Sequence, residues 1–331
     1  MQRPVIGITM GDAAGIGPEI TVKLLANGDV YRISKPLVIG DRKVLQNVLD
    51  KAGSRLSLNV ISNPGEARFI WGVIDVLDMD NIDIENLQMG HVDKMCGRAA
   101  VEYVKEAVKL VKARKIQAIL TAPLCKESMH QAGLRYGGHT ELLAHLAKTK
   151  DVVMMIAGGA LRTVLATRHL PIKKVSPSIK TSEIVRLLQI TDKSFKKFLG
   201  IKKPKIVVSS LNPHGGEGGL LGSEEKKIII PAVKQASKKN INVSGPLPPD
   251  VAIYEAARGR FDVAVVMYHD QALVPVKLLA FHNSINVTLG LPFVRTSPCH
   301  GTAFDIAGKG LADARSMMEA LKMAVHMTLK R

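Results

Sequence analysis

Short runs of apolar, mostly β-branched residues alternate along the chain with longer segments in which apolar residues recur at helical spacing. A run of four to eight such residues predicts a buried strand, whereas a spacing of i, i+3, i+4 predicts an amphipathic helix. The predicted strands are residues 5–9, 37–39, 73–77, 118–121, 152–156, 163–166, 206–209, 263–267 and 285–288. The predicted helices are residues 97–113, 140–147, 182–188, 224–236 and 314–329.

This repeated succession of strand and helix predicts an α/β fold with a largely parallel sheet. In such sheets ligands bind beyond the carboxyl ends of the strands, so we look for functional residues there. No linker or low-complexity stretch divides the chain, and the Pro-rich stretch at 245–250 is predicted to be a loop. Two domains, if present, are therefore expected to be interleaved.

Composition and charge narrow the class of protein. Of the 331 residues, 46% are hydrophobic, and Lys plus Arg outnumber Asp plus Glu by 46 to 29, a formal charge of +17. The basic residues are scattered, so we expect a surface that attracts small anions and no nucleic-acid partner. The longest apolar run is too short to span a bilayer, so we expect no membrane association. Three widely separated cysteines without a CxxC pair predict a cytoplasmic protein.

Three of the predicted strands run directly into histidines, at His169, His214 and His269. A single histidine in such a place is more often a hydrogen-bonded structural residue than a ligand. Three at equivalent strand ends favour a divalent metal site, because imidazole binds such metals and three protein ligands leave room for substrate.

Glycine-rich and charged segments offer further candidates. Four glycines lie among residues 215–219, where they suit either an anion cradle or a tight turn. Lys277, Asn286 and Arg295 flank a predicted strand and could hold a phosphate, although ordinary surface charge is the commoner explanation for Lys277 taken alone. His139 and Thr140 stand at a predicted helix start, where Thr140 could serve simply as an N-cap. The glycines of residues 11–17 do not have GxGxxG spacing, so they are a weak dinucleotide motif.

Taken together, these motifs resemble the 4-hydroxythreonine-4-phosphate dehydrogenase (PdxA) family, including its relatives that act on 4-phosphorylated threonate or erythronate. The resemblance covers nearly the whole chain. It is carried by the segments at residues 11–19, 121–126, 138–141, 245–248 and 286–297, together with the three histidine motifs. Residues 300–310 also resemble the nucleotide segment of isopropylmalate and isocitrate dehydrogenases.

The resemblance implies two interleaved α/β/α domains of the isocitrate/isopropylmalate dehydrogenase type, with an active cleft between them. We place the first domain at about residues 1–125 plus 300–331 and the second at about 126–299. NAD, or NADP in its place, is implied to bind at Gly301, Thr302 and Asp305. A homodimer with a shared active site is also implied, in which His269 comes from the partner subunit.

The implied activity is NAD-dependent oxidation and decarboxylation of a small 4-phosphorylated hydroxy acid. The substrate is 4-phosphohydroxy-L-threonine, in pyridoxal phosphate biosynthesis, or 4-phospho-D-threonate or 4-phospho-D-erythronate. The implied residues are metal ligands for one zinc, magnesium or cobalt ion and a set of substrate contacts. The metal ligands are His169, His214 and His269, and the substrate contacts are His139, Thr140, Lys277, Asn286 and Arg295.

Three residues, Asp250, Asp270 and Lys126, are candidates for the general base, and only geometry can choose among them. Two other functions remain open at this point. A phosphate acyltransferase on a related fold would need neither the histidines nor NAD. A non-catalytic metal- or anion-binding protein would show no NAD-dependent turnover.

Overall fold

The computed structural model describes residues 3–330, which form two compact units that the chain enters in turn. Unit 1 comprises residues 3–150 and 291–329, and unit 2 comprises residues 151–290 together with Lys330. The chain passes between the two units near residues 150 and 290, whereas the expected domain boundaries lay near residues 125 and 299. Residues 126–147 stay in unit 1 because the helices Lys126–Gln131 and His139–Ala147 pack on the helix Lys94–Lys112. Residues 294–298 do so because they pair with the strand Ala118–Thr121.

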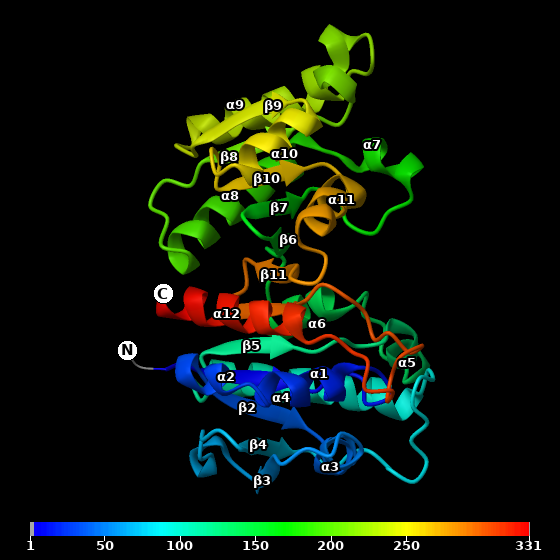
Figure 1. The fold of residues 1–331 in the computed structure, drawn as a ribbon. Helices are drawn as coiled ribbons and strands as arrows, with labels where there is room; N and C mark the ends of the chain where they lie inside the picture. The colour runs from blue at the N-terminus through cyan, green and yellow to red at the C-terminus, as the bar shows by residue number, and fades with distance from the viewer. Residues whose placement is uncertain (1–2, 331) are drawn as a thin grey trace. The chain divides into compact units, whose positions relative to one another are not determined.

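Unit 1 is a parallel sheet in the order β3-β4-β2-β1-β5-β12. Its strands are β1 (Val5–Thr9), β2 (Lys35–Gly40), β3 (Ser57–Ile61), β4 (Val73–Asp78), β5 (Ala118–Thr121) and β12 (Val294–Pro298). Its helices are α1 (Gly17–Leu25), α2 (Gly28–Ile33), α3 (Arg42–Lys51), α4 (Lys94–Lys112), α5 (Lys126–Gln131), α6 (His139–Ala147) and α12 (Arg315–Leu329), with a 3-10 turn η1 (Pro64–Glu66). One group of helices, α1, α2, α3 and α12, packs together, and α4 packs with α5 and α6 (Figure 1).

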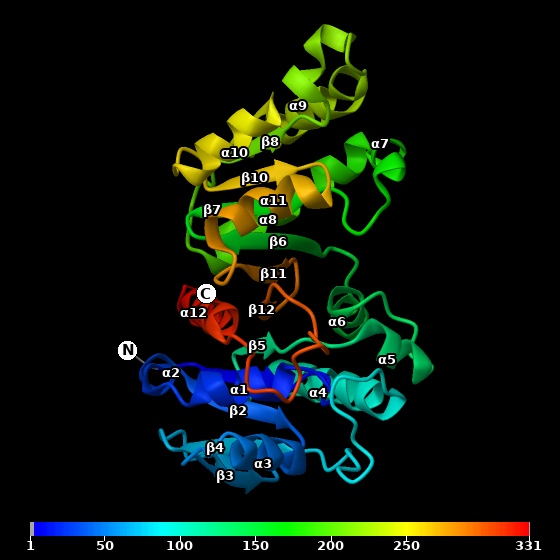
Figure 2. The same cartoon turned by 45° about the vertical axis from the view of Figure 1, so that its right-hand side comes forward.

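Unit 2 is a mixed sheet in the order β11-β6-β7-β10-β8-β9, parallel from β7 to β9 and antiparallel around β6. Its strands are β6 (Val153–Gly158), β7 (Leu161–Leu165), β8 (Ile206–Ser209), β9 (Val243–Leu247), β10 (Val263–Val266) and β11 (Ile285–Leu289). Its helices are α7 (Val175–Ser178), α8 (Thr181–Phe198), α9 (Ile230–Lys238), α10 (Pro249–Ala257) and α11 (His269–Ala280), with 3-10 turns η2 (Ile172–Lys174) and η3 (Pro213–Gly219) and a π-helical turn η4 (Glu225–Ile229). Helix α8 packs with α9, whereas α10 and α11 cover β7 and β10 (Figure 2).

The predicted α/β class is confirmed, and each of the nine predicted strands is present with ends shifted by no more than two residues. The central strands of both sheets are buried along almost their whole length, which is why they appear as continuous apolar runs. The prediction of a loop at residues 245–250 was wrong. Residues 243–247 form the edge strand β9, where Pro246 is tolerated because an edge strand need not donate every N–H, and Pro249 begins α10.

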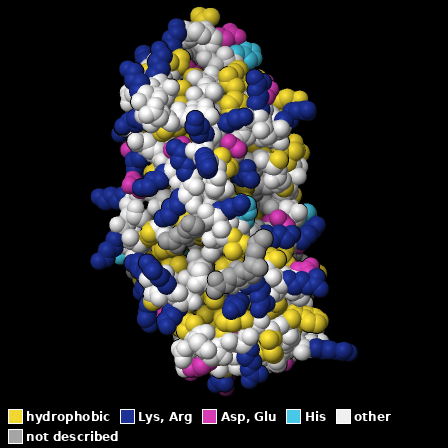
Figure 3. All heavy atoms as spheres, turned by 90° about the vertical axis from the view of Figure 1, so that its left-hand side faces the viewer, with side chains coloured by type: hydrophobic (Ala, Val, Ile, Leu, Met, Phe, Trp, Pro, Cys, Tyr) yellow, Lys and Arg dark blue, Asp and Glu magenta, His cyan; other side chains and the backbone are white. Residues whose placement is uncertain are grey.

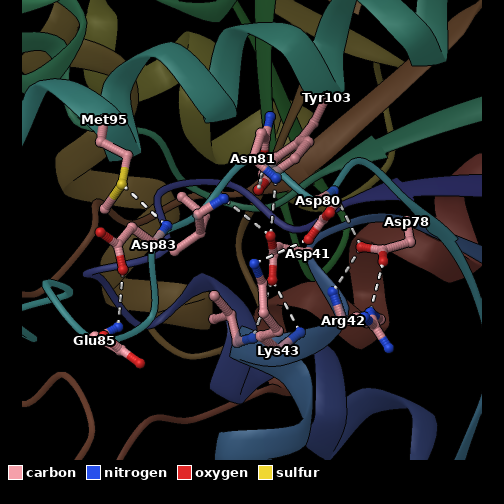
Figure 4. Close-up of polar contacts among 12 residues, drawn as sticks. Asp41, Arg42, Lys43, Asp78, Asp80, Asn81, Asp83, Glu85, Met95 and Tyr103 are labelled. Carbon is pink, nitrogen blue, oxygen red and sulfur yellow. Dashed lines mark hydrogen bonds and ion pairs between the residues drawn. The ribbon is translucent and has the colours of Figure 1, made fainter.

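A cluster of acidic and amide side chains fixes the loop after β4 in unit 1 (Figure 4). Buried Asp41 caps α3 by accepting from the N–H groups of Lys43 and Val44. Its second oxygen accepts from the N–H groups of Asn81 and Ile82, both at 3.0 Å. Because backbone donors engage both oxygens of this carboxylate, we assign it a structural role.

Lys and Arg side chains are spread over the whole face shown in Figure 3, with apolar side chains between them. No helix within residues 3–330 is both long enough and apolar enough to cross a bilayer.

Candidate functional site

Three neighbouring strands of unit 2 end at the predicted metal-ligand histidines. Strand β10 pairs in parallel with β7 on one side and with β8 on the other. His169 follows β7, His269 begins α11 just after β10, and His214 follows β8. The carboxyl ends of parallel neighbours meet at one edge of a sheet, so all three histidines are carried to the same edge.

The imidazole rings of His169 and His269 lie side by side in one chain, with their centroids 5.5 Å apart. The family resemblance implied that His269 reaches the site from a partner subunit, whereas here it accompanies His169 of its own chain. Within residues 3–330, no three His, Cys, Asp or Glu side chains are gathered closely enough to hold a metal ion.

Carboxylates orient two of these histidines. The Nδ1 atom of His214 lies 2.8 Å from Oε1 of Glu217, and the Nδ1 atom of His269 lies 2.7 Å from Oδ1 of Asp270. Metal-binding histidines usually pass their second ring N–H to a carboxylate or carbonyl, which fixes the ring and makes it a better ligand. Both rings therefore have Nε2 left for a ligand, and the donor set suits a divalent transition metal. Glu217 was not among the candidates from the sequence, although it stands three residues after His214.

The glycine-rich segment after His214 folds as a left-handed turn. Residues 214–219 all have positive φ, including 53° at His214 and 40° at Glu217. Glycine adopts this conformation without steric cost, so the turn alone accounts for four glycines in this segment.

Unit 1 holds a buried cation of its own. Arg295, on β12, is 2% exposed and donates a 2.6 Å hydrogen bond from Nη2 to Oγ1 of Thr121 at the end of β5. Burial lowers the pKa of Arg295 to about 9. Guanidinium groups are costly to bury, and they bind carboxylates and phosphates with good geometry. Thr121 belongs to a motif that carried the resemblance, but no pattern along the chain pairs it with Arg295.

His139 begins α6 in the same unit. Burial lowers the pKa of its ring well below the ordinary value, and the nearby charge of Arg295 lowers it further. His139 is partly exposed as a residue, yet its Nε2 atom is buried and has no hydrogen-bond partner within residues 3–330. The idea that Thr140 caps the helix was wrong, because Gly138 is the N-cap and Thr140 lies buried in the first turn.

Unit 2 holds the two remaining predicted substrate contacts. Lys277, on α11, donates from Nζ to the carbonyl oxygen of Phe281 at 3.3 Å and lies over the Phe281 ring. Asn286, on β11, has a buried Oδ1 with no hydrogen-bond partner in the described part of the chain. An unsatisfied buried acceptor is costly, which is a reason to look for a ligand there.

The candidate bases lie in different environments. Asp250 is an exposed residue in the first turn of α10, and Asp270 is engaged by His269. The Lys126 side chain passes close to Gly138, where a Cβ would lie 3.4 Å from its Cε.

The predicted nucleotide segment, residues 301–310, lies against the N-terminal loop of unit 1. Ile16 donates from its backbone N–H to the carbonyl of Thr302 at 3.0 Å, and a Cβ on Gly15 would lie 2.9 Å from the Cβ of Thr302. At least part of the N-terminal glycine pattern therefore serves packing. Gly301 has open space where a Cβ would stand, and Asp305 is exposed.

Known proteins are similar to this chain over nearly its whole length. The family model described as pyridoxal phosphate biosynthetic protein PdxA matches residues 32–324. A 4-hydroxythreonine-4-phosphate dehydrogenase of Desulforapulum autotrophicum is 46% identical over 323 residues, which is 98% of this chain and 95% of that protein. A D-threonate 4-phosphate dehydrogenase of Cupriavidus necator is also 46% identical, over 99% of this chain and 98% of that protein.

Among solved structures, a 4-hydroxythreonine-4-phosphate dehydrogenase from Klebsiella pneumoniae superposes with a TM-score of 0.91 at 39% identity, covering 99% of this chain and 98% of that one. Sequence and fold agree over nearly the whole length, and the chain belongs to the PdxA family of pyridoxal phosphate biosynthetic proteins.

Proposed function

We propose that this protein is a metal-dependent dehydrogenase that oxidises and decarboxylates a small 4-phosphorylated hydroxy acid, with NAD as hydride acceptor. The observation that carries the proposal is the row of three histidines at the ends of β7, β10 and β8, two of them oriented by carboxylates. The names of the relatives support this substrate class and leave two forms, one with an amine on C2 and one with a hydroxyl. They also weigh against the acyltransferase and non-catalytic alternatives.

In this proposal each group has a separate task. His169, His214 and His269 would hold the ion, and a divalent ion there would polarise the C3 hydroxyl and stabilise the charge that develops on its oxygen. Arg295 and Lys277 bind the phosphate, whose binding energy positions the reacting carbon. His139 is kept neutral by its surroundings, so its Nε2 can accept a hydrogen bond from the substrate or donate one to it, depending on the tautomer.

The proposal includes a cytoplasmic homodimer with a shared active site. Helix α11, which begins at His269, exposes an apolar stripe along one face. Val274, Leu278 and Phe281 are 64%, 85% and 65% exposed, and their spacing of four and three residues places them on the same side of the helix. Such exposed stripes usually mark contact surfaces, and a second copy of the chain is the proposed partner.

The direct test is a substrate panel. The purified protein is assayed with 4-phosphohydroxy-L-threonine, 4-phospho-D-threonate and 4-phospho-D-erythronate, with NAD or NADP and with added zinc, magnesium or cobalt, by nicotinamide absorbance. We expect turnover of at least one compound and loss of turnover with a chelator. Absence of turnover in every combination would contradict the proposal.

Arg295→Ala is expected to raise the KM for the phosphorylated substrate about 10- to 150-fold, because losing a charge-assisted hydrogen bond to phosphate costs about 1.5–3 kcal/mol. Lys277→Ala should act in the same direction, and the KM for NAD should stay close to that of the wild type. Arg32→Ala, which removes an exposed arginine paired with Asp29, is the matched control. Wild-type KM values in both site variants would rule out the phosphate assignment.

We also propose that the adenosine side of NAD binds at residues 301–310, near Gly301, Thr302 and Asp305. A carboxylate in this position can accept hydrogen bonds from ribose hydroxyls and repels the 2′-phosphate of NADP. Asp305→Ala is expected to raise the KM for NAD about tenfold, because one such hydrogen bond is lost. The variant should also discriminate less between NAD and NADP than the wild type does. An unchanged KM for both nucleotides would place the adenosine elsewhere.

A further inference from the structure

The loop that carries His214 is held in an unusual backbone conformation. His214 and Glu217 both have positive φ, which side chains other than glycine rarely adopt. Such conformations persist only where the surroundings impose them. Contacts with residues outside the turn are therefore needed to hold residues 214–219 in this conformation.

A buried carboxylate supplies that restraint. Glu225, 2% exposed at the start of η4, accepts from the backbone N–H groups of Leu211 and Asn212 through Oε1, both at 2.9 Å. Its Oε2 accepts from Nδ2 of Asn212, also at 2.9 Å. We call these contacts between Glu225 and residues 211–212 the Asn212 clamp. The clamp ends two residues before His214.

Neighbouring residues form hydrogen bonds with the Asn212 clamp or pack closely against it. Glu224 also accepts from Nδ2 of Asn212, at 2.8 Å, and is itself hydrogen-bonded by Ser176. Two consecutive glutamates thus accept hydrogen bonds from the side chain of Asn212 at the start of the π-helical turn η4. Such π-helical turns are frequent at functional sites. A Cβ on Gly216 would stand 2.7 Å from Oε2 of Glu225, and one on Gly222 would stand 2.3 Å from Nδ2 of Asn212. These two glycines are required by the clamp as well as by their positive φ angles.

We propose that Glu225 is a positioning residue for the metal site, which holds the backbone before His214 so that its imidazole is presented to the ion. The inference rests on the proposed function, in which His214 is a ligand. Glu225 itself touches neither the ion nor the substrate. Its role differs from that of Glu217, which orients the ring of His214 directly, whereas Glu225 fixes the backbone from which the ring projects.

Cobalt binding tests this role without relying on turnover. The full chain is stripped of metal, and the Kd for Co²⁺ is measured by competition with a chromophoric chelator and by the visible absorption of the bound ion. Glu225→Ala is expected to weaken binding about 10- to 100-fold, the usual effect of losing an outer-shell partner. Glu225→Gln should lose less, because its amide oxygen still accepts from Leu211 and Asn212. Glu183→Ala, an exposed glutamate on α8 paired with Arg186, is the control and should bind as the wild type does.

A second variant separates positioning from general destabilisation. Asn212→Ala removes the other side of the clamp, and the double variant with Glu225→Ala should bind Co²⁺ no more weakly than the weaker single variant. Circular dichroism checks that each variant is folded at the assay temperature, and Glu225→Gln decides the question if Glu225→Ala is not.

The outcomes are distinguishable. Folded Glu225 variants that bind Co²⁺ as tightly as the wild type would overturn the positioning role and leave the proposed function standing. A wild-type protein that binds no Co²⁺ would overturn the metal site and this inference together.

Discussion

Replacing His169, His214 or His269 with alanine is expected to lower kcat by at least about a thousandfold in each case, which corresponds to roughly 4 kcal/mol of lost transition-state stabilisation. The reason is that each variant removes one of the three proposed ligands, and the remaining two would hold a divalent ion weakly. Metal content, measured on the purified variants, should fall together with activity. His91→Ala is a suitable control, because this histidine is exposed and its Nδ1 contacts the carbonyl oxygen of the nearby Met89.

Variants of the two carboxylates beside the histidines provide a second test of the proposed metal site. Glu217→Gln and Asp270→Asn should each weaken metal binding about 10- to 100-fold, well short of losing a ligand. Asp270 is also a candidate base, and the same variant tests that role. Loss of kcat with metal affinity unchanged would identify Asp270 as the base, whereas loss of affinity that added metal repairs would identify it as a support for His269. Any histidine variant that kept full activity would remove that residue from the ligand set.

The three histidines illustrate what the sequence could and could not predict. Each was found from a local pattern, an apolar run ending in His, and each indeed follows a strand. The order of these strands across the sheet could not be predicted from the sequence. Strand β8 precedes β10 in the chain, yet β10 lies between β7 and β8 in the sheet. Strand pairing is a non-local property that periodicity does not encode. The adjacency of His169 and His269 therefore emerged only from the structure.

Strand β12 was not predicted, because its sequence does not have the pattern of a buried strand. It is buried along its whole length, yet its sequence, VRTSP, has no apolar alternation and was not predicted as a strand. It contains polar residues because it carries Arg295 to the end of β5, where Thr121 accepts from the guanidinium. Local pattern rules fail where a strand serves a site rather than a core. Strands β3 and β9 were not predicted for another reason, because both are edge strands with partly exposed residues.

Mixed dimers test the proposed sharing of the active site between two subunits. Co-expression of His214→Ala with His269→Ala is expected to restore about a quarter of wild-type activity. If those two ligands reach one ion from different chains, a mixed dimer has one site that lacks both and one that keeps both. With random pairing half the dimers are mixed and half of their sites work. The measurement is kcat per total site on the mixture, with mixed dimers verified by two different affinity tags.

The other two pairings identify which ligand the second chain supplies. Recovery in the mixture of His169→Ala with His269→Ala would make His269 of the partner subunit the third ligand, as the family resemblance implies. Recovery in the mixture of His169→Ala with His214→Ala would instead pair His169 with His269 in one chain, as their 5.5 Å ring separation suggests, and draw His214 from the other. Once the mixture of His214→Ala with His269→Ala has recovered, only one of these two further mixtures can recover, because two ligands of each site share a chain. If verified mixed dimers stayed inactive in all three pairings, every site would be built from a single chain, and the shared site would be excluded.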